Sequence, residues 1–225
     1  DKDLSEIPNL IWRKDKKQVF NLQTYTINQE IIDNLKFSDF EVIKNFDKYN
    51  KIHLNDHSSL NNKNYSNIFY YNCGRGCPVN CSFCGGSNIS QGIINSRKKV
   101  ITINHDSVIK ELKNTKKKGI DIWYTCFDPF PKDDYYIKLF KRIKDEKLQL
   151  SLIFECWSLP TKKFVDSFFE TFNINNSEMI ISPECGSDRI RRKNKGYIYT
   201  NKELIDILRY INQKGIKIGI YFTAG

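Results

Sequence analysis

The sequence lacks long hydrophobic runs and any recognisable targeting segment. Apolar residues make up 40% of the 225 residues, but charged residues interrupt them before any run approaches the roughly 20 residues of a membrane helix. The N-terminus has neither the basic and apolar regions of a signal peptide nor the Arg/Ser-rich pattern of a transit peptide. We therefore expect a soluble, cytoplasmic protein with no membrane partner.

The sequence also lacks the second pair of ligands that a zinc ribbon requires. Its one Cys-x-x-Cys pair is Cys81 to Cys84, and no histidine pair follows it. Without a secretion signal, seven cysteines indicate metal binding or redox chemistry rather than a disulfide framework. Three of them stand alone, and four fall within twelve positions: Cys73, Cys77, Cys81 and Cys84.

The net charge of +10 has no matching nucleic-acid-binding motif. Lysine and arginine are spread through every segment together with many asparagine and isoleucine residues, so a general compositional bias explains most of the excess. No known nucleic-acid reader motif is present. The composition therefore does not favour nucleic acid as a partner but does not exclude it, and only the tight cluster Arg189 to Lys195 is a candidate for a local role.

The chain divides into a leader over residues 1–64 and a regular core over residues 65–225. The leader has short apolar patches and then a polar stretch, Asn55 to Asn64, whose composition is typical of a linker. In the core, short apolar or β-branched runs alternate with amphipathic stretches. The predicted strands are Asn67–Tyr71, Ile120–Phe127, Leu148–Glu155, Glu178–Ser182 and Ile216–Phe222.

The stretches between these strands have helical spacing. The clearest helix begins at the capping box Thr200 to Glu203 and ends near Gly215. Strand and helix alternate at about 30 to 40 residues per unit, which predicts an α/β fold with parallel strands joined by right-handed crossovers. An open doubly wound sheet and a barrel fit this pattern equally well.

Chemistry-bearing residues follow the predicted strands at their C-terminal ends, where both kinds of α/β sheet bind ligands. The cysteine cluster follows the first strand and Asp128 the second. Glu155 and Cys156 end the third strand, and Glu184 and Thr223 follow the fourth and fifth. We therefore expect one face of the molecule to carry the site.

The segment Cys77-x3-Cys81-x2-Cys84 places three thiols on one short loop. Three thiolates bind three irons of a [4Fe–4S] cluster and leave the fourth iron without a protein ligand, so that it can bind another molecule. Cys73 is interpreted as a small buried residue. The alternative is a non-catalytic module, in which Cys73 completes a four-thiolate site for zinc or for a closed cluster.

This cysteine spacing, with the aromatic Phe83 before the last cysteine, resembles the signature of radical S-adenosylmethionine (radical SAM) enzymes. The wording from Arg75 to Gly86 is most similar to the branch that usually carries an N-terminal cobalamin-binding domain, and the leader from Leu4 to Arg13 resembles the connector after that domain. The 225 residues contain no cobalamin module and no Asp-x-His-x-x-Gly motif.

The resemblance covers about residues 4–225 and implies a partial (β/α)6 barrel of the TIM-like kind, with the cluster loop after its first strand. Five strands precede Gly225, so we expect a barrel truncated after the fifth strand and preceded by an irregular leader. The resemblance implies that Cys77, Cys81 and Cys84 bind the cluster. It also implies that the amino and carboxylate groups of S-adenosylmethionine chelate the open iron.

Further cofactor contacts follow from the same resemblance. The family often has Gly-Gly-Glu after the second strand, where this chain has Asp128, and Glu155 is a candidate for the ribose hydroxyls. The segment Pro183 to Ser187 resembles the family's Glu-Ser-Gly-Ser, and Arg192 is a candidate cation for the cofactor carboxylate. An ordinary helix cap or salt bridge explains each polar residue equally well. The full predicted cofactor-binding set is Phe83, Gly85, Gly86, Asp128, Glu155, Glu184, Ser187 and Arg192.

The implied reaction is reductive cleavage of S-adenosylmethionine to a 5′-deoxyadenosyl radical, which takes a hydrogen atom from an unknown substrate. The cluster and S-adenosylmethionine carry this chemistry while the protein supplies orientation and excludes water. It requires an external one-electron reductant of the flavodoxin or ferredoxin kind. Methyl transfer is the expected outcome where another domain supplies cobalamin. A radical SAM enzyme that modifies tRNA is the alternative, and the basic charge would serve it.

Overall fold

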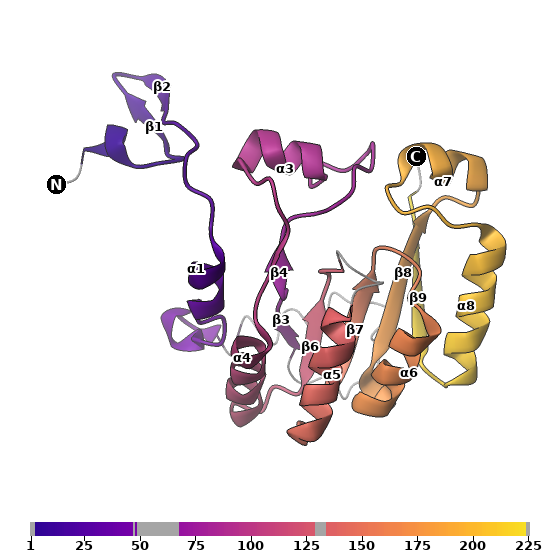
Figure 1. Cartoon of the computed structure of the whole chain (residues 1–225). Helices are drawn as coiled ribbons and strands as arrows, with labels where there is room; N and C mark the ends of the chain where they lie inside the picture. Colours follow the sequence, from indigo (N-terminus) through magenta and orange to yellow (C-terminus); the bar gives the residue numbers. More distant parts are fainter. Residues whose placement is uncertain (1–2, 47, 49–67, 129–133, 224–225) are drawn as a thin grey trace.

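A five-stranded parallel sheet forms the centre of the structure. The computed structural model describes residues 3–46, 48, 68–128 and 134–223. Within them the strand order is β3-β6-β7-β8-β9, the order along the chain, and every neighbouring pair is parallel (Figure 1). The α/β class and the five strands predicted from the sequence are thus confirmed. Their bounds are β3 (Ile68–Tyr70), β6 (Ile122–Thr125), β7 (Ser151–Cys156), β8 (Glu178–Glu184) and β9 (Lys217–Phe222).

Four helices lie side by side along one face of the sheet (Figure 1). They are α4 (His105–Lys117), α5 (Tyr135–Asp145), α6 (Lys162–Thr171) and α8 (Asn201–Gln213). The predicted capping box at the start of α8 is present: Thr200 accepts from the Glu203 amide, and Glu203 accepts from the Thr200 amide. No helix among the described residues is long and apolar enough to span a bilayer.

The two faces of the sheet bury separate sets of side chains. The helix-covered face carries the large core, which includes Leu139, Phe140 and Phe168, each with none of its surface exposed. The opposite face carries a small cluster of four isoleucines, one from each of the first four strands of the sheet: Ile68, Ile122, Ile153 and Ile180. Apolar residues on both faces are typical of a parallel sheet that is covered on both sides.

The leader is more regular than the sequence predicts. Residues 3–46 contain a hairpin of β1 (Ile11–Lys14) and β2 (Lys17–Phe20) and the short helix α1 (Gln29–Asn34). The hairpin turn places Asp15 and Lys16 at positive φ, the geometry of a tight two-residue turn. That turn usually contains glycine or asparagine, so Asp-Lys gave no turn signal. The predicted linker Asn55 to Asn64 lies outside the described residues.

The second half of the leader packs on the core. Ile32 is 1% exposed and Phe40 is 9% exposed, and both belong to the main hydrophobic cluster. The amide of Ser38 donates to the buried carboxylate of Glu111 in α4, at 2.6 Å. The regular core therefore includes side chains from before residue 65.

A short antiparallel pair holds both ends of the cysteine segment. β4 (Gly74–Arg75) precedes the cysteines and pairs with β5 (Ile101–Thr102), which follows helix α3 (Asn88–Asn95). A side chain at Gly74 would overlap the Ile101 carbonyl and the Phe127 ring. Residues 76–100, which include α3, therefore form a long connection after β3 whose two ends are held together by the β4–β5 pair.

Phe140 is expected to be a main contributor to stability because its buried ring contacts those of Tyr136, Phe164, Phe168 and Phe172. We expect Phe140→Ala to lower the free energy of unfolding by about 3–5 kcal/mol through lost packing and a residual cavity. Phe169 is the control because it is 38% exposed, and its replacement by alanine should cost about 1 kcal/mol or less. Urea unfolding measures both, and equal losses would contradict this view of the core.

Candidate active site

A cavity of about 410 Å³ lies at the C-terminal ends of the strands. The cysteine loop forms one wall, and residues that end or follow β6, β7 and β8 form the others. The cavity brings together seven of the residues predicted from the sequence: Cys77, Cys81, Phe83, Cys84, Gly86, Glu155 and Glu184. The expectation that these residues gather at one end of the strands is therefore confirmed, whereas their roles stay predictions.

The cysteine loop is held by contacts from the end of helix α7 (Asp188–Asn194) and from the residues just after it. The amide and hydroxyl of Ser82 donate to the backbone and side-chain oxygens of Asn194, each at 2.8 Å. The amide of Gly196 donates to Cys81 Sγ at 3.1 Å, and the amide of Gly86 donates to Cys84 Sγ at 3.3 Å. Such donors stabilise negative charge on sulfur, which metal-bound cysteines carry.

The three loop thiols fit an iron–sulfur cluster as a donor set. They line one cavity and two of their sulfurs accept backbone hydrogen bonds, whereas burial raises the pKa of the free Cys77 thiol. In the described part of the chain, no three Cys, His, Asp or Glu side chains are arranged around a single metal ion. The cysteines of a cluster bind different irons and need no such convergence.

Cys73 is fully buried in the hydrophobic core and does not line this cavity. Burial raises the pKa of its thiol far above the ordinary value. The interpretation of Cys73 as a small buried residue is confirmed. A different thiol, that of Cys126 at the end of β6, lines the cavity and contacts the side-chain amide of Asn72.

An acidic side chain and a basic side chain, Glu184 at the end of β8 and Lys195 directly after α7, both line the cavity. Glu184 has a φ of 66° at an irregularity in the β8–β9 pairing, and its carboxylate accepts from the hydroxyl of Thr223 at 2.9 Å. The ammonium group of Lys195 lies 3.3 Å from the other oxygen of Glu184 and also donates to the Ser182 carbonyl. Lys195 is 7% exposed, so the cavity contains a nearly buried positive charge.

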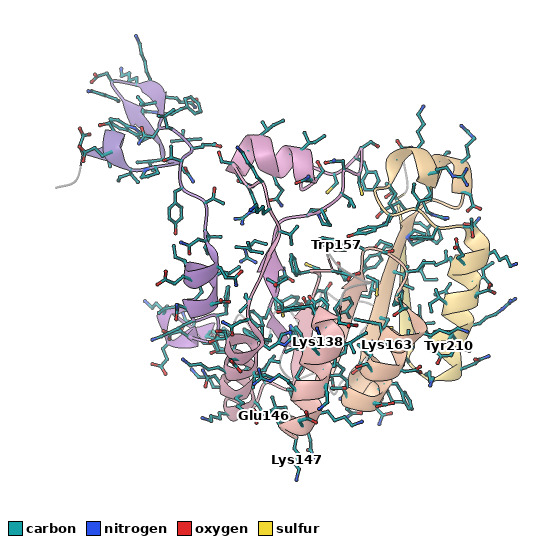
Figure 2. The ribbon with its side chains drawn as sticks, viewed as in Figure 1. Lys138, Glu146, Lys147, Trp157, Lys163 and Tyr210 are labelled. Atoms are coloured by element: carbon teal, nitrogen blue, oxygen red, sulfur yellow. The ribbon has the colours of Figure 1, made fainter. Side chains whose placement is uncertain are left out.

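Glu155 and Trp157 project from the end of β7. The hydroxyl of Tyr124 donates to the Glu155 carboxylate, and burial, followed by Glu155 itself, raises the pKa of Tyr124. Figure 2 shows Trp157 at the end of the sheet opposite Glu146 and Lys147. The sheet therefore presents an acidic group and an aromatic ring at the same edge of the cavity.

Four predicted residues lie outside the cavity lining: Gly85, Asp128, Ser187 and Arg192. Asp128 is 1% exposed, and one of its oxygens accepts from the Trp157 amide at 2.9 Å. Burial raises the pKa of Asp128 to about 8. Ser187 caps helix α7, while Gly85 and Arg192 are exposed. The cofactor contacts predicted for these four residues stay predictions.

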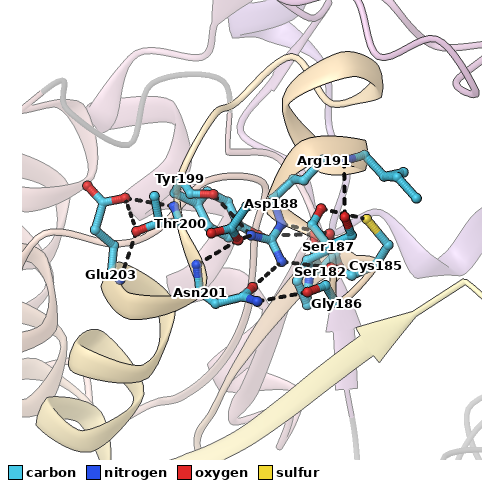
Figure 3. Close-up of polar contacts among 12 residues, drawn as sticks. Ser182, Cys185, Gly186, Ser187, Asp188, Arg191, Tyr199, Thr200, Asn201 and Glu203 are labelled. Carbon is cyan, nitrogen blue, oxygen red and sulfur yellow. Dashed lines mark hydrogen bonds and ion pairs between the residues drawn. The ribbon is translucent and has the colours of Figure 1, made fainter.

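The neighbouring Arg191 is fully buried and uses all five donors of its guanidinium group (Figure 3). This network connects the end of β8, helix α7 and the start of α8. Its acceptors are the carbonyls of Pro183, Cys185 and Tyr199 and the side chains of Asp188 and Asn201. Arg191 thereby fixes the loop that carries Glu184 and the segment that leads to Lys195.

Eight residues beyond the predicted seven line the cavity. Two of them, Gly76 and Val79, belong to the cysteine loop, and sequence reasoning missed the other six: Gln91, Cys126, Trp157, Ser182, Lys195 and Tyr197. The rule that ligands gather at strand ends could have found Cys126, Trp157 and Ser182. Lys195 belongs to the basic cluster already noted, but the sequence alone did not show which of its side chains turns inward. Gln91 and Tyr197 gave no signal.

The sequence profile of the radical SAM superfamily matches residues 71–225. This chain belongs to the radical SAM superfamily. No curated protein matches the radical SAM chain in sequence. The family match confirms the resemblance seen in the cysteine motif and supports the predicted iron–sulfur cluster and S-adenosylmethionine as cofactors.

Two solved structures of TsrM from Kitasatospora setae, a radical S-adenosylmethionine methyltransferase, resemble the radical SAM chain with a TM-score of 0.56 at 14% identity. One holds cobalamin and a [4Fe–4S] cluster, and the other holds tryptophan and an S-adenosylmethionine analogue. Each match covers 68% of this chain and 30% of TsrM. HydG, a maturase of the [FeFe]-hydrogenase, matches with a TM-score of 0.48 at 14% identity, over 91% of this chain and 42% of HydG. The TsrM matches agree with the predicted partial radical SAM barrel.

Gly196 is expected to be essential for the shape of the cysteine loop. A Cβ at this position would lie 2.7 Å from Val79 Cγ2, so Gly196→Ala must displace the loop and weaken the hydrogen bond to Cys81. We expect the reconstituted variant to hold far less iron than the wild type. The matched control is Gly186→Ala, because a Cβ there meets nothing within 4 Å. Iron analysis after reconstitution measures both, and full iron content in Gly196→Ala would contradict the assignment.

Replacement by lysine should lower the stability of the protein far more at Arg191 than at its exposed neighbour Arg192. Lysine cannot reproduce the planar set of five donors, and each buried acceptor left unpaired costs about 1–3 kcal/mol. We therefore expect Arg191→Lys to lower the free energy of unfolding by about 3 kcal/mol. Arg192→Lys should change it by about 0.5 kcal/mol or less. Chemical denaturation compares the two, and a neutral Arg191→Lys would show that the network is dispensable.

Proposed function

We propose that the chain is the catalytic core of a radical SAM enzyme in which Cys77, Cys81 and Cys84 hold a [4Fe–4S] cluster. The observation that carries this proposal is the presence of these three thiols, on one backbone-anchored loop, in a cavity that also contains Glu155, Glu184 and Lys195. When bound, the cluster and S-adenosylmethionine together supply a 5′-deoxyadenosyl radical that removes a hydrogen atom from the substrate.

The residues of the cavity suit the polar parts of S-adenosylmethionine. Lys195 is the nearly buried cation and is a better candidate than Arg192 for the methionine carboxylate. Glu155 is an acceptor for the ribose hydroxyls, and Tyr124 holds its carboxylate in place. Tyr197 and Trp157 line the same space and limit the access of water to it.

The reductant in this proposal is a flavodoxin- or ferredoxin-like protein of the cytoplasm. Cys84 and Phe83 support direct electron delivery because both are exposed at the outer end of the cysteine loop, with Phe83 at 55%. An electron carrier can therefore approach the cluster edge from solvent without entering the cavity.

The overall reaction in this proposal is methyl transfer with cobalamin from a domain outside these 225 residues. The wording of the cysteine loop and of the leader from Leu4 to Arg13 favours this outcome. The fold likeness to TsrM is compatible with it, although the chain spans 30% of that protein.

The test of this function is the response of the reduced cluster to S-adenosylmethionine. Anaerobically reconstituted protein should hold about four irons and four sulfides per chain. Its EPR spectrum should change when S-adenosylmethionine is added, because the cofactor would bind the open iron. An unchanged spectrum would refute the open-iron assignment.

Cysteine variants identify the ligands in the same experiment. Replacing Cys77, Cys81 or Cys84 by alanine should abolish the EPR signal. Cys73→Ser and Cys126→Ala are the controls, one from the core and one from the same cavity, and both should retain iron. Loss of iron in either control would instead support a closed four-thiolate site.

A further inference from the structure

A second cavity, of about 580 Å³, lies beside the cluster cavity. Its walls come from the leader segment around Gln23 and Tyr25, from helix α3 and from the two arginines Arg75 and Arg97. Gln91 of α3 lines both cavities. The two spaces are therefore neighbours across the first turns of α3.

The second cavity is positively charged and contains no acid in its lining. Arg75 and Arg97 are both half-buried, and neither forms an ion pair within the described ranges. Burial, followed by the charge of Arg75, lowers the pKa of Arg97. Two like charges held together in this way gain stability when an anion binds between them.

The arginines are built into the base of the cysteine loop. Arg75 lies in β4, two residues before Cys77, and its guanidinium group donates to the Gly74 carbonyl at 3.0 Å. A Cβ at Gly76 would lie 3.2 Å from Cδ of Arg97, so the stem of that arginine covers the backbone just before Cys77. The positions of both cations are thus tied to that of the cluster loop.

The leader wall is also attached to α3 by hydrogen bonds. The hydroxyl of Ser96 donates to the Gln23 carbonyl at 2.9 Å, and the hydroxyl of Thr26 donates to the Asn95 carbonyl at 3.3 Å. Ser96 adopts a left-handed conformation with a φ of 52°, which ends α3 and directs the chain into Arg97. The cavity is therefore a fixed part of the fold.

We propose that this second cavity binds an oxyanion of the substrate, a carboxylate or a phosphate, through the forked guanidinium groups of Arg75 and Arg97. The guanidinium group of an arginine binds a carboxylate or a phosphate through two parallel hydrogen bonds. The shared wall at Gln91 then directs the rest of the substrate toward the cluster cavity. This inference rests on the proposed radical SAM function, and it names the substrate class as a molecule with an anionic end.

The test is calorimetric titration of the reconstituted full chain, in a buffer without phosphate, with inorganic phosphate and separately with succinate. We expect one of the two probes to bind, which also distinguishes phosphate from carboxylate substrates. Arg75→Gln and Arg97→Gln should each weaken that binding about tenfold or more through loss of charged hydrogen bonds. Lys98→Gln is the matched control because Lys98 is exposed beside Arg97, and it should alter binding less than about twofold.

Arg97→Lys is the second variant. It keeps the charge but loses the planar pair of donors, so it should bind the anion more weakly than the wild type. Failure of both probes to bind, or equal weakening by Lys98→Gln and Arg97→Gln, would overturn the proposal. The EPR response to S-adenosylmethionine is recorded on the same samples. A lost EPR response with intact anion binding refutes the radical function and the substrate role, whereas an intact response without anion binding refutes only this inference.

Discussion

The site depends on one long-range constraint, the attachment of the cysteine loop to residues 194–196. Ser82 and Cys81 each bond to that segment, which lies more than a hundred residues further along the chain. Contacts within the loop itself are local, such as the hydrogen bond from the Asn88 amide to the Val79 carbonyl at 2.9 Å. The attachment to residues 194–196 joins the proposed cluster ligands to the residues at and after the end of β8, and both sets line the same cavity.

The attachment is in turn maintained by buried charge. Arg191 fixes helix α7 against the end of β8, and Lys195 bonds to Ser182 and Glu184. Burying cations is costly unless every donor finds a partner. Arg191 meets this condition with five acceptors, so it gives the segment a defined position. Lys195 lines the cavity, so its ammonium group can also donate a hydrogen bond to a ligand there.

The sequence predicted what depends on periodicity and spacing. Alternation of apolar runs located all five strands, and the capping box located the start of α8, because these signals are local. The cysteine spacing located the candidate cluster ligands for the same reason. The hairpin of the leader was missed because Asp15 and Lys16 adopt positive φ without the glycine or asparagine that usually marks it. Choosing between Arg191 and Arg192 required knowing which face of a seven-residue helix meets the sheet, and no periodic pattern settles that over two turns. Lys195 directly follows this helix, where no periodic pattern applies.

The distribution of positive charge also changes how the basic composition is understood. Most lysines lie on the surface, as a general bias predicts, but Arg75, Arg97 and Lys195 line two adjoining cavities. A cluster held by three thiolates is anionic, and each electron that it accepts adds negative charge. Cations that are fixed nearby stabilise that charge more than mobile surface lysines do, because burial reduces screening. An anion bound between Arg75 and Arg97 would offset part of this effect, so occupancy of the second cavity and the ease of cluster reduction are expected to be coupled.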